Sequence, residues 1–227
     1  TFAASAGPVM ASSNEFHITI RGKGSHAALP HNGIDPVPVA CQMVQAFQTI
    51  VTRNKKPIET AVISVTMINA GEATNVVPDS CEIQGTVRTF TTETLDLVER
   101  RMKTIAEATC AAFETQCEFE FKRNYPSTVN HPAETEFARQ LLGEVVGAEN
   151  VLEFEPTMGS EDFSYFLQAK PGCYFLIGNG DGTHREGGHG MGPCMLHNPS
   201  YDFNDDLIPL GATAWVRMAE KWLGSAR

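Results

Sequence analysis

Several features that would assign this sequence quickly to a class are missing from it. No run approaches the roughly 18 consecutive apolar residues of a membrane-spanning helix, so we expect a soluble chain. The six cysteines include no C-x-x-C pair, and their spacing fits neither a zinc knuckle nor a redox motif. Reduced, mostly buried thiols are therefore expected, which is typical of a cytoplasmic protein.

Basic residues are also scarce. Lys and Arg number 17 against 27 Asp and Glu, which gives a net charge of −10. Nucleic acids and anionic membranes require clustered cations, so neither is an expected partner. An anionic small ligand would have to be held by individually placed cations.

The chain does not begin with Met. Its first eleven residues are small and apolar, but no basic stretch precedes them, so they make a poor signal peptide. We therefore expect a chain that has been processed or taken from a longer protein. The 227 residues, 42% of them apolar, suffice for two small domains with hydrophobic cores.

The first of these domains is predicted over residues 13–125. Alternating or β-branched segments predict strands over 14–23, 60–70, 82–90 and 117–122. Apolar residues spaced at three and four predict helices over 36–53, capped by Asp35 with Pro36 in first position, and over 92–113. The order strand-helix-strand-strand-helix-strand is ferredoxin-like, with both helices on one face of the sheet.

A second domain is predicted over residues 126–227, after the turn-forming segment 125–132. Helices are expected over 133–146, from Ser160–Glu161 onward and over 205–223, short strands over 151–154 and 173–177, and a glycine-rich loop over 178–192. Two strands and three helices make a poor independent α/β domain, so this half is interpreted as part of a larger sheet. Residues 1–12 are interpreted as a remnant of the same domain or a linker.

His26 is the first candidate site residue. It lies in GKGSHAALPH, flanked by small residues on a loop that leaves a strand, where an imidazole could approach a ligand and stabilise an oxyanion. The pattern alone favours the simpler interpretation that His26 occupies a turn before the helix.

Asn75 and Arg88 come from NAGEATNVVP and the strand that follows it. Asn75 offers a donor and an acceptor, and Arg88 offers a bidentate fork for a carboxylate. A turn former before Pro78 and a solvated arginine on the polar face of its strand are the simpler interpretations, and the pattern alone favours both.

Two further segments carry candidates. In MGSEDF, Gly159 and Ser160 could orient a substrate at a helix start, although Ser160 as an ordinary N-cap is the commoner case. The loop over 181–205 contains His184, His189 and His197, and neutral imidazole is a common metal ligand. A chance occurrence of three histidines in one loop is an equally good interpretation. The glycines are not followed by G-K-[ST], so a phosphate-binding P-loop is excluded.

Four segments together resemble a known family in content and order: GKGSHAALPHNGIDP, NAGEATNVVPDSCEIQGTVRTF, MGSEDFSYF and LHNPSYDFNDD. The family is that of the dinuclear-metal amidohydrolases and aminoacylase-like metallopeptidases, in the branch of hippurate hydrolases and indole-acetyl-amino-acid hydrolases. The resemblance implies a ferredoxin-like lid that dimerises over residues 13–125. It also implies the C-terminal part of an α/β catalytic domain over residues 126–227.

The same resemblance implies a role for each candidate. His197 would be a metal ligand, and His26 would reach the partner subunit's active site and polarise the scissile carbonyl. Asn75 and Arg88 would hold the substrate carboxylate. Gly159 and Ser160 would line the substrate pocket, whereas His184 and His189 would be ordinary loop residues.

The family's other metal ligands and its general-base glutamate lie before the lid, and none of those motifs occurs in this chain. We therefore hypothesise the C-terminal portion of an enzyme that hydrolyses N-acyl amino acids with two divalent ions, such as Zn, Mn, Co or Ni. The chain alone would be inactive. A non-catalytic, dimerising, carboxylate-binding module and a dipeptidase of the same family are the alternatives.

Overall fold

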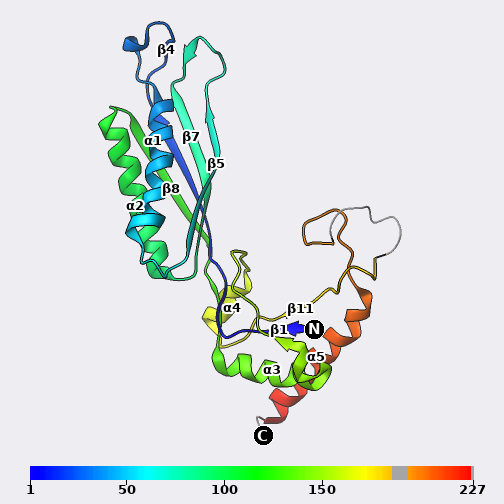
Figure 1. Ribbon diagram of the computed structural model, residues 1–227. Coiled ribbons are helices and arrows are strands. Elements are labelled where there is room, and N and C mark those ends of the chain that lie inside the picture. Colours follow the sequence, from blue (N-terminus) through cyan, green and yellow to red (C-terminus); the bar gives the residue numbers. More distant parts are fainter. Residues whose placement is uncertain (186–193, 226–227) are drawn as a thin grey trace. The chain divides into compact units, whose positions relative to one another are not determined.

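The structure is a computed structural model that describes residues 1–185 and 194–225, and these form two compact units (Figure 1). Unit 1 comprises Thr1–Val9, Val129–Glu155 and the chain from Phe166 onward. Unit 2 comprises Met10–Thr128 and Pro156–Tyr165. Unit 2 thus includes a segment that the sequence boundaries assign to the second domain, and those boundaries stay a prediction.

Unit 2 is built on a four-stranded antiparallel sheet in the order β5-β7-β3-β8. Helices α1 and α2 lie side by side over one face of it (Figure 1). In chain order the elements are β3 (Ser13–Arg21), α1 (Pro36–Thr49), β5 (Ala61–Ala70), β7 (Ser80–Thr89), α2 (Thr92–Ala112) and β8 (Gln116–Tyr125). This is the ferredoxin-like arrangement, so the predicted fold is confirmed.

The core of unit 2 lies between the sheet and the two helices. On β3, Phe16, Ile18 and Ile20 are buried, as strand alternation predicts. Met43 and Phe47 of α1 pack against them, and the rings of Phe16 and Phe47 meet edge to face with centroids 6.2 Å apart. Buried apolar area of this kind is the main source of stability in such a unit.

Both helices start at side-chain caps. The Asp35 carboxylate accepts a hydrogen bond from the Val37 amide at 2.9 Å, and Thr91 Oγ1 accepts one from the Thr94 amide at 3.2 Å. The first helix does not continue regularly to Arg53, because α1 is followed by a π-helical turn, η2 (Ile50–Asn54).

Short strands occupy segments that the sequence analysis treats as loops. β4 (Ser25–His26) pairs with β6 (Val76–Val77) at the tip of unit 2, next to the 3₁₀ turn η1 (Pro30–Asn32) (Figure 1). β2 (Gly7–Met10) pairs with β9 (Thr128–Asn130). Strands of two to four residues are too short to show a period in the sequence, which is why alternation does not predict them.

Unit 1 has a small sheet in the order β10-β1-β11, in which β1 runs parallel to β10 and antiparallel to β11. Helices α3 and α5 pack against each other. The elements that lie wholly or partly in unit 1 include β1 (Phe2–Ala3), α3 (Pro132–Val146), η3 (Ala148–Asn150), β10 (Val151–Leu152), α4 (Phe163–Ala169), β11 (Leu176–Ile177), η4 (Asp205–Leu207) and α5 (Ile208–Ser225).

Three predictions in this region need correction. The strands expected over 151–154 and 173–177 each contain only two residues of regular strand. The last helix begins at Ile208, after the 3₁₀ turn η4. Helix α4 begins at Phe163 and not near Ser160, so Ser160 is not the residue that caps it.

The six cysteines are free thiols, as expected, but only Cys81 and Cys110 are buried. Cys41 is exposed and the other three are half-buried, so the expectation of mostly buried thiols is wrong. None of the helices in the described part of the chain is long and apolar enough to cross a membrane.

Candidate functional site

His26 and Asn75 lie together at the tip of unit 2, although 48 residues separate them in the sequence. His26 pairs with Val76 across the β4–β6 ladder. The Ala27 amide donates to the carbonyl of Asn75 at 3.0 Å. Two separate loops are thus joined into one small platform, and both predicted site residues are exposed on it.

The local hydrogen bonds also fix which nitrogen of His26 carries the proton. The Ala28 amide donates to Nδ1 of His26 at 3.1 Å. A backbone N–H can only donate, so Nδ1 is an acceptor, and in the neutral ring the proton is on Nε2. His26 therefore presents an N–H donor, which is the group that stabilises a developing oxyanion.

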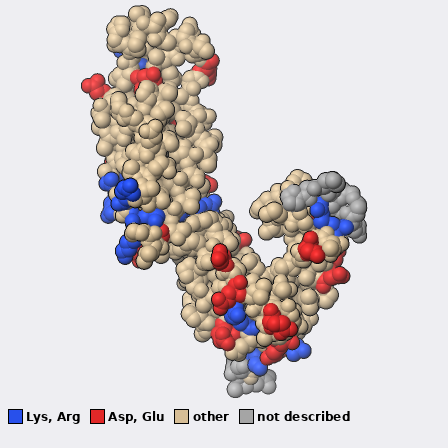
Figure 2. Space-filling view, viewed as in Figure 1, with Lys and Arg blue, Asp and Glu red and all other residues tan. Residues whose placement is uncertain are grey.

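A pocket of about 510 Å³ adjoins this platform. Its lining comes from both loops and includes Ala27, Thr74 and Val76. On the face shown in Figure 2, this end of unit 2 is mostly uncharged, with a few acidic and basic side chains. The platform thus offers hydrogen-bonding groups rather than a basic surface.

Arg88 lies near the other end of β7, and its side chain is half-buried. Its Nη1 donates to Oγ of Ser160 at 2.8 Å. Ser160 is held in unit 2 by its own segment, in which Thr157 forms a bridge with Met10 and its carbonyl accepts from the Ala11 amide at 3.1 Å. The structure thus brings together two predicted substrate-binding residues.

Gly159 lies beside Ser160 in the same segment. A Cβ added to Gly159 would lie 2.8 Å from Cε of Met10 and 3.3 Å from Oγ1 of Thr157. The glycine therefore allows this segment to lie close against Met10, which helps to place the Ser160 hydroxyl beside Arg88.

The two pairs are far apart within one chain. The Gly22 amide, at the base of the β4 loop, donates to the carbonyl of Asp79 at one end of β7, and Arg88 is eight residues along from Ser80. At about 3.3 Å per strand residue this separates the pairs by roughly 26 Å along the sheet. A single small molecule cannot contact both pairs in one protomer.

His197 lies in unit 1, in the segment before η4. Its φ is 66°, a left-handed conformation that few non-glycine residues adopt, and it is exposed. Asn198 stabilises the turn, since its Oδ1 accepts from the Ser200 amide at 2.9 Å and its carbonyl accepts from the Tyr201 amide at 2.9 Å. Sparsely populated backbone conformations cluster at functional sites, so the backbone of His197 makes it a candidate functional residue.

His184 has a structural position in the same region. Its Nε2 lies 2.9 Å from the carbonyl of Asp202, which also accepts from Nδ2 of Asn179 at 2.8 Å. His184 thus helps to shape this loop, and its lack of a role in the site stays a prediction. His189 lies outside the described residues.

The described residues contain no group of three or more His, Cys, Asp and Glu side chains that could hold a metal ion. His197 is a chemically suitable ligand, because an exposed neutral imidazole can coordinate a divalent ion. It would supply one of the three or more ligands that protein metal sites generally have.

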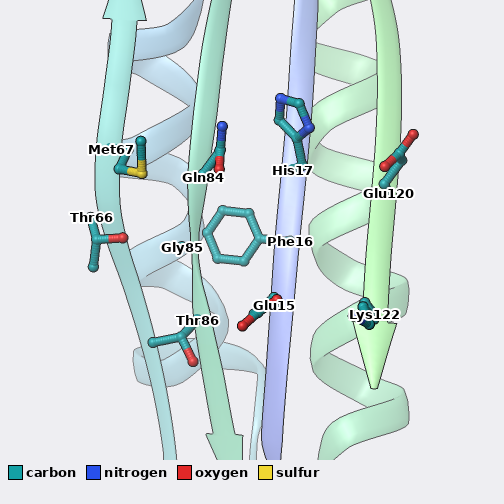
Figure 3. Close-up of a pocket in the computed structure, with 10 residues that line it drawn as sticks. All are labelled: Glu15, Phe16, His17, Thr66, Met67, Gln84, Gly85, Thr86, Glu120 and Lys122. Atoms are coloured by element: carbon teal, nitrogen blue, oxygen red, sulfur yellow. The ribbon is translucent and has the colours of Figure 1, made fainter. Parts of the chain in front are cut away.

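A further pocket, of about 370 Å³, lies on the open face of the sheet (Figure 3). His17, Glu15, Glu120 and Lys122 line it from β3 and β8, and His17 lies 3.6 Å from Glu82. No predicted site residue lines it. This is the polar face that an antiparallel sheet commonly turns to water, and its carboxylates make it unsuitable for an anionic substrate.

Most of unit 2 is similar in sequence to a known family. Residues 11–114 match the family model described as the peptidase dimerisation domain, M20_dimer. This segment is an M20 peptidase dimerisation domain. The match covers the strands and helices that carry His26, Asn75 and Arg88.

Relatives of known description align with nearly the whole chain. An N-acetyl-L-cysteine deacetylase of Bacillus subtilis is 39% identical over 219 residues, which are 96% of this chain and 50% of the relative. An IAA-amino acid hydrolase of Arabidopsis thaliana is 34% identical over 221 residues, 96% of this chain and 49% of the relative. The chain thus spans about half the length of these curated relatives.

A solved structure is also similar to nearly the whole chain. A dinuclear-metal-binding peptidase of the M20 family from Bacillus subtilis superposes with a TM-score of 0.74 at 26% identity. The superposition covers 98% of this chain and 53% of that one. The similarity therefore extends beyond the dimerisation domain into unit 1.

Proposed function

We propose that this chain is the C-terminal part of a metal-dependent amidohydrolase that cleaves the amide bond of N-acyl amino acids, with hippurate-like substrates. The observation that carries the proposal is the pair of polar clusters at opposite ends of one dimerisation domain. His26 and Asn75 form one, and Arg88 and Ser160 form the other. A second copy of the chain can bring His26 of one protomer to Arg88 of the other.

In this homodimer each residue has a distinct task. His26 donates its Nε2–H to the carbonyl oxygen of the scissile amide as negative charge develops there. Arg88 and Asn75 bind the free carboxylate of the amino acid, the guanidinium through its planar fork. Ser160 and Gly159 line the pocket, with Ser160 holding Arg88 in place.

The metal centre would contain two divalent ions, Zn, Mn, Co or Ni, and would activate the attacking water. His197 would supply one ligand from unit 1. The other ligands would come from a preceding half of the protein, in keeping with relatives about twice as long.

The surface of α5 supports this reading of the chain as a portion of a larger domain. Trp215, Val216, Trp222 and Leu223 of α5 are all more than half exposed. They lie in or beside an apolar pocket of about 490 Å³ between α3 and α5. Exposed apolar groups on this scale are typical of a surface that another segment covers.

The test is metal analysis and hydrolysis by the full-length protein, with the 227-residue chain alongside. We expect about two metal ions per protomer and release of glycine from N-benzoylglycine by the full-length protein, in a cytoplasmic extract as well as after purification. Cleavage of unblocked dipeptides in preference to N-acyl amino acids would indicate a dipeptidase. A full-length protein that dimerises and binds carboxylates, but holds no metal, would be the non-catalytic module.

The role of His26 has a matched control in the same loop. Removing one oxyanion donor typically lowers kcat by about 10²–10³. We therefore expect His26→Ala to lower kcat by about this factor with a much smaller change in KM. His31→Ala removes a second exposed histidine five residues away and should leave both parameters near wild type. Unchanged turnover in His26→Ala would contradict the proposed role.

A further inference from the structure

Asp79 makes two contacts with the loop that carries His26. Its Oδ1 accepts a hydrogen bond from the Gly24 amide at 2.7 Å, and its carbonyl accepts one from the Gly22 amide at 2.9 Å. Asp79 itself stands between β6, which pairs with β4, and β7, which belongs to the central sheet. It is therefore placed to connect the platform with the rigid part of the unit.

The glycines of the loop show how closely it packs at this point. A Cβ on Gly24 would lie 2.9 Å from Oδ1 of Asp79 and 3.1 Å from the Val77 carbonyl. A Cβ on Gly33 would lie 2.6 Å from Oγ of Ser25. Any side chain at Gly24 would have to displace the Asp79 carboxylate or the β6 backbone.

Backbone hydrogen bonds also join the two ends of the loop that carries β4 and η1. Lys23 and Ile34 exchange backbone hydrogen bonds of 2.8 and 2.9 Å, which ties the residues before and after β4 and η1 together. β4 itself contributes only two residues of ladder to β6. So short a ladder has little stability of its own, and the bond from Asp79 to Gly24 adds an anchor immediately before it.

We propose that Asp79 is a positioning residue: its carboxylate anchors β4 on β6 and thereby holds His26, with Nε2 as the N–H donor, next to Asn75. This rests on the proposed function for the catalytic contribution of His26. The anchoring itself is a property of the chain and can be tested without activity. Asp79 touches neither substrate nor metal in this proposal.

The first test is amide exchange and histidine NMR on the 227-residue chain. Asp79→Ala should speed hydrogen exchange at Gly24 and Ala27 by about tenfold or more. Exchange at Ile18 and Ile83, in the central ladder, should stay within about twofold and so report that the unit is folded. The separate ¹⁵N resonances of protonated Nε2 and unprotonated Nδ1 in His26 should give way to a tautomer mixture.

Three further variants test the anchoring. Asp79→Asn keeps an oxygen acceptor for Gly24 and should retain slow exchange within about threefold, together with the His26 tautomer. Asp35→Ala removes a carboxylate–amide bond of the same kind from the start of α1, and should speed exchange at Val37 but not at Gly24. Gly24→Ala places a methyl group against the Asp79 carboxylate and so disrupts its hydrogen bond with the Gly24 amide. This variant should reproduce the effect of Asp79→Ala.

The second test is kinetic, on the full-length protein. Asp79→Ala should lower kcat about tenfold or more with less than a threefold change in KM, and Asp79→Asn should restore it. Slow exchange at Gly24 in Asp79→Ala, or an unchanged His26 tautomer, would overturn the proposal. If the wild-type protein hydrolyses no N-acyl amino acid, the proposed function fails, and the exchange experiment still decides the anchoring.

Discussion

Arg88 and Ser160, 72 residues apart in the chain, are joined by a hydrogen bond of 2.8 Å from Nη1 to Oγ. The bond fixes one arm of a guanidinium that is half-buried at the end of β7. An arginine that has lost part of its rotamer freedom in this way is prepared for a planar anion, since less entropy is lost when the ligand binds. In the proposed enzyme, Ser160 would thus act on the substrate carboxylate through Arg88.

This pair predicts a measurable coupling. A hydrogen bond to a charged group contributes about 1.5–3 kcal/mol, and partial exposure brings this one toward the lower value. We expect a double-mutant cycle of Ser160→Ala and Arg88→Met to give a coupling of about 1.5 kcal/mol in the free energy of unfolding. Ser164→Ala, which removes a nearby hydroxyl bonded to the Glu161 carbonyl, should show no coupling to Arg88. Equal coupling for both serines would contradict the assignment.

The separation of His26 from Arg88 predicts complementation between inactive subunits. If each site takes His26 from one protomer and Arg88 from the other, a dimer of a His26→Ala subunit and an Arg88→Ala subunit has one intact site. Purified mixed dimers of the full-length protein should therefore recover about half of wild-type activity, although each variant alone is nearly inactive. The measurement is kcat of differently tagged subunits purified as heterodimers.

A matched control uses two variants of the same residue. His26→Ala mixed with His26→Gln has no intact site in any dimer and should stay as inactive as its components. Activity in the first mixture no higher than in this control would mean that His26 and Arg88 do not act across subunits.

The sequence predicts the sheet and helices of unit 2 well because their apolar residues recur with the spacing of the structure they form. The spacing is two residues in a strand and three or four in a helix. Phe16, Ile18 and Ile20 alternate with polar neighbours over a whole strand, and burial follows that alternation. The cap of α1 is equally local, since Asp35 and its partner Val37 are two residues apart.

The candidate site, in contrast, depends on tertiary contacts that leave no regular pattern of apolar and polar residues in the sequence. β4 and β6 have two residues each, so nothing in the pattern indicates that His26 and Asn75 meet. Ser160 is a residue type that commonly caps helices, and it precedes two acidic residues. Its hydroxyl nevertheless accepts a hydrogen bond from Arg88, and α4 begins three residues later. Resemblance to a family selects these residues, but only the tertiary structure shows which of them are neighbours.

The close packing around Gly85 predicts that adding a single methyl group there lowers the free energy of unfolding strongly. It lies on the buried face of β7 opposite Phe16 and Val65, next to the point where the β5 register shifts between Val65 and Met67. A Cβ there would collide with the Ser64 carbonyl and would lie 2.6 Å from Cζ of Phe16. Gly85→Ala should therefore cost about 2 kcal/mol or more, in the range of overpacked cores.

The measurement is the urea midpoint at constant m, with Gly71→Ala as the comparison. Gly71 has a φ of 70° but only distant neighbours, so its replacement reports backbone strain without a collision. A Gly85→Ala midpoint equal to that of the wild type would show that β7 and the Phe16 ring can move apart at little cost.

The ion pair of Arg21 with Glu118 predicts a specific pH dependence. Arg21 donates to the Glu118 carboxylate from Nε at 2.6 Å and from Nη2 at 3.1 Å, and this hydrogen bonding lowers the pKa of Glu118 below its ordinary value. A carboxylate whose pKa is lower in the folded state stabilises the fold above its unfolded value, near 4.3. That contribution is lost as the pH falls through the lower, folded value.

Both side chains are more than half exposed, at 52% and 57%, so the effect is small and sensitive to salt. We expect the loss of unfolding free energy between pH 7 and pH 3 to be slightly smaller in Glu118→Gln than in the wild type. The difference should shrink as salt is added. Glu120→Gln removes a carboxylate from the same face of β8 without touching this pair, and serves as the control. Equal reductions in Glu118→Gln and Glu120→Gln would mean that total charge, and not the Arg21 pair, sets the acid sensitivity.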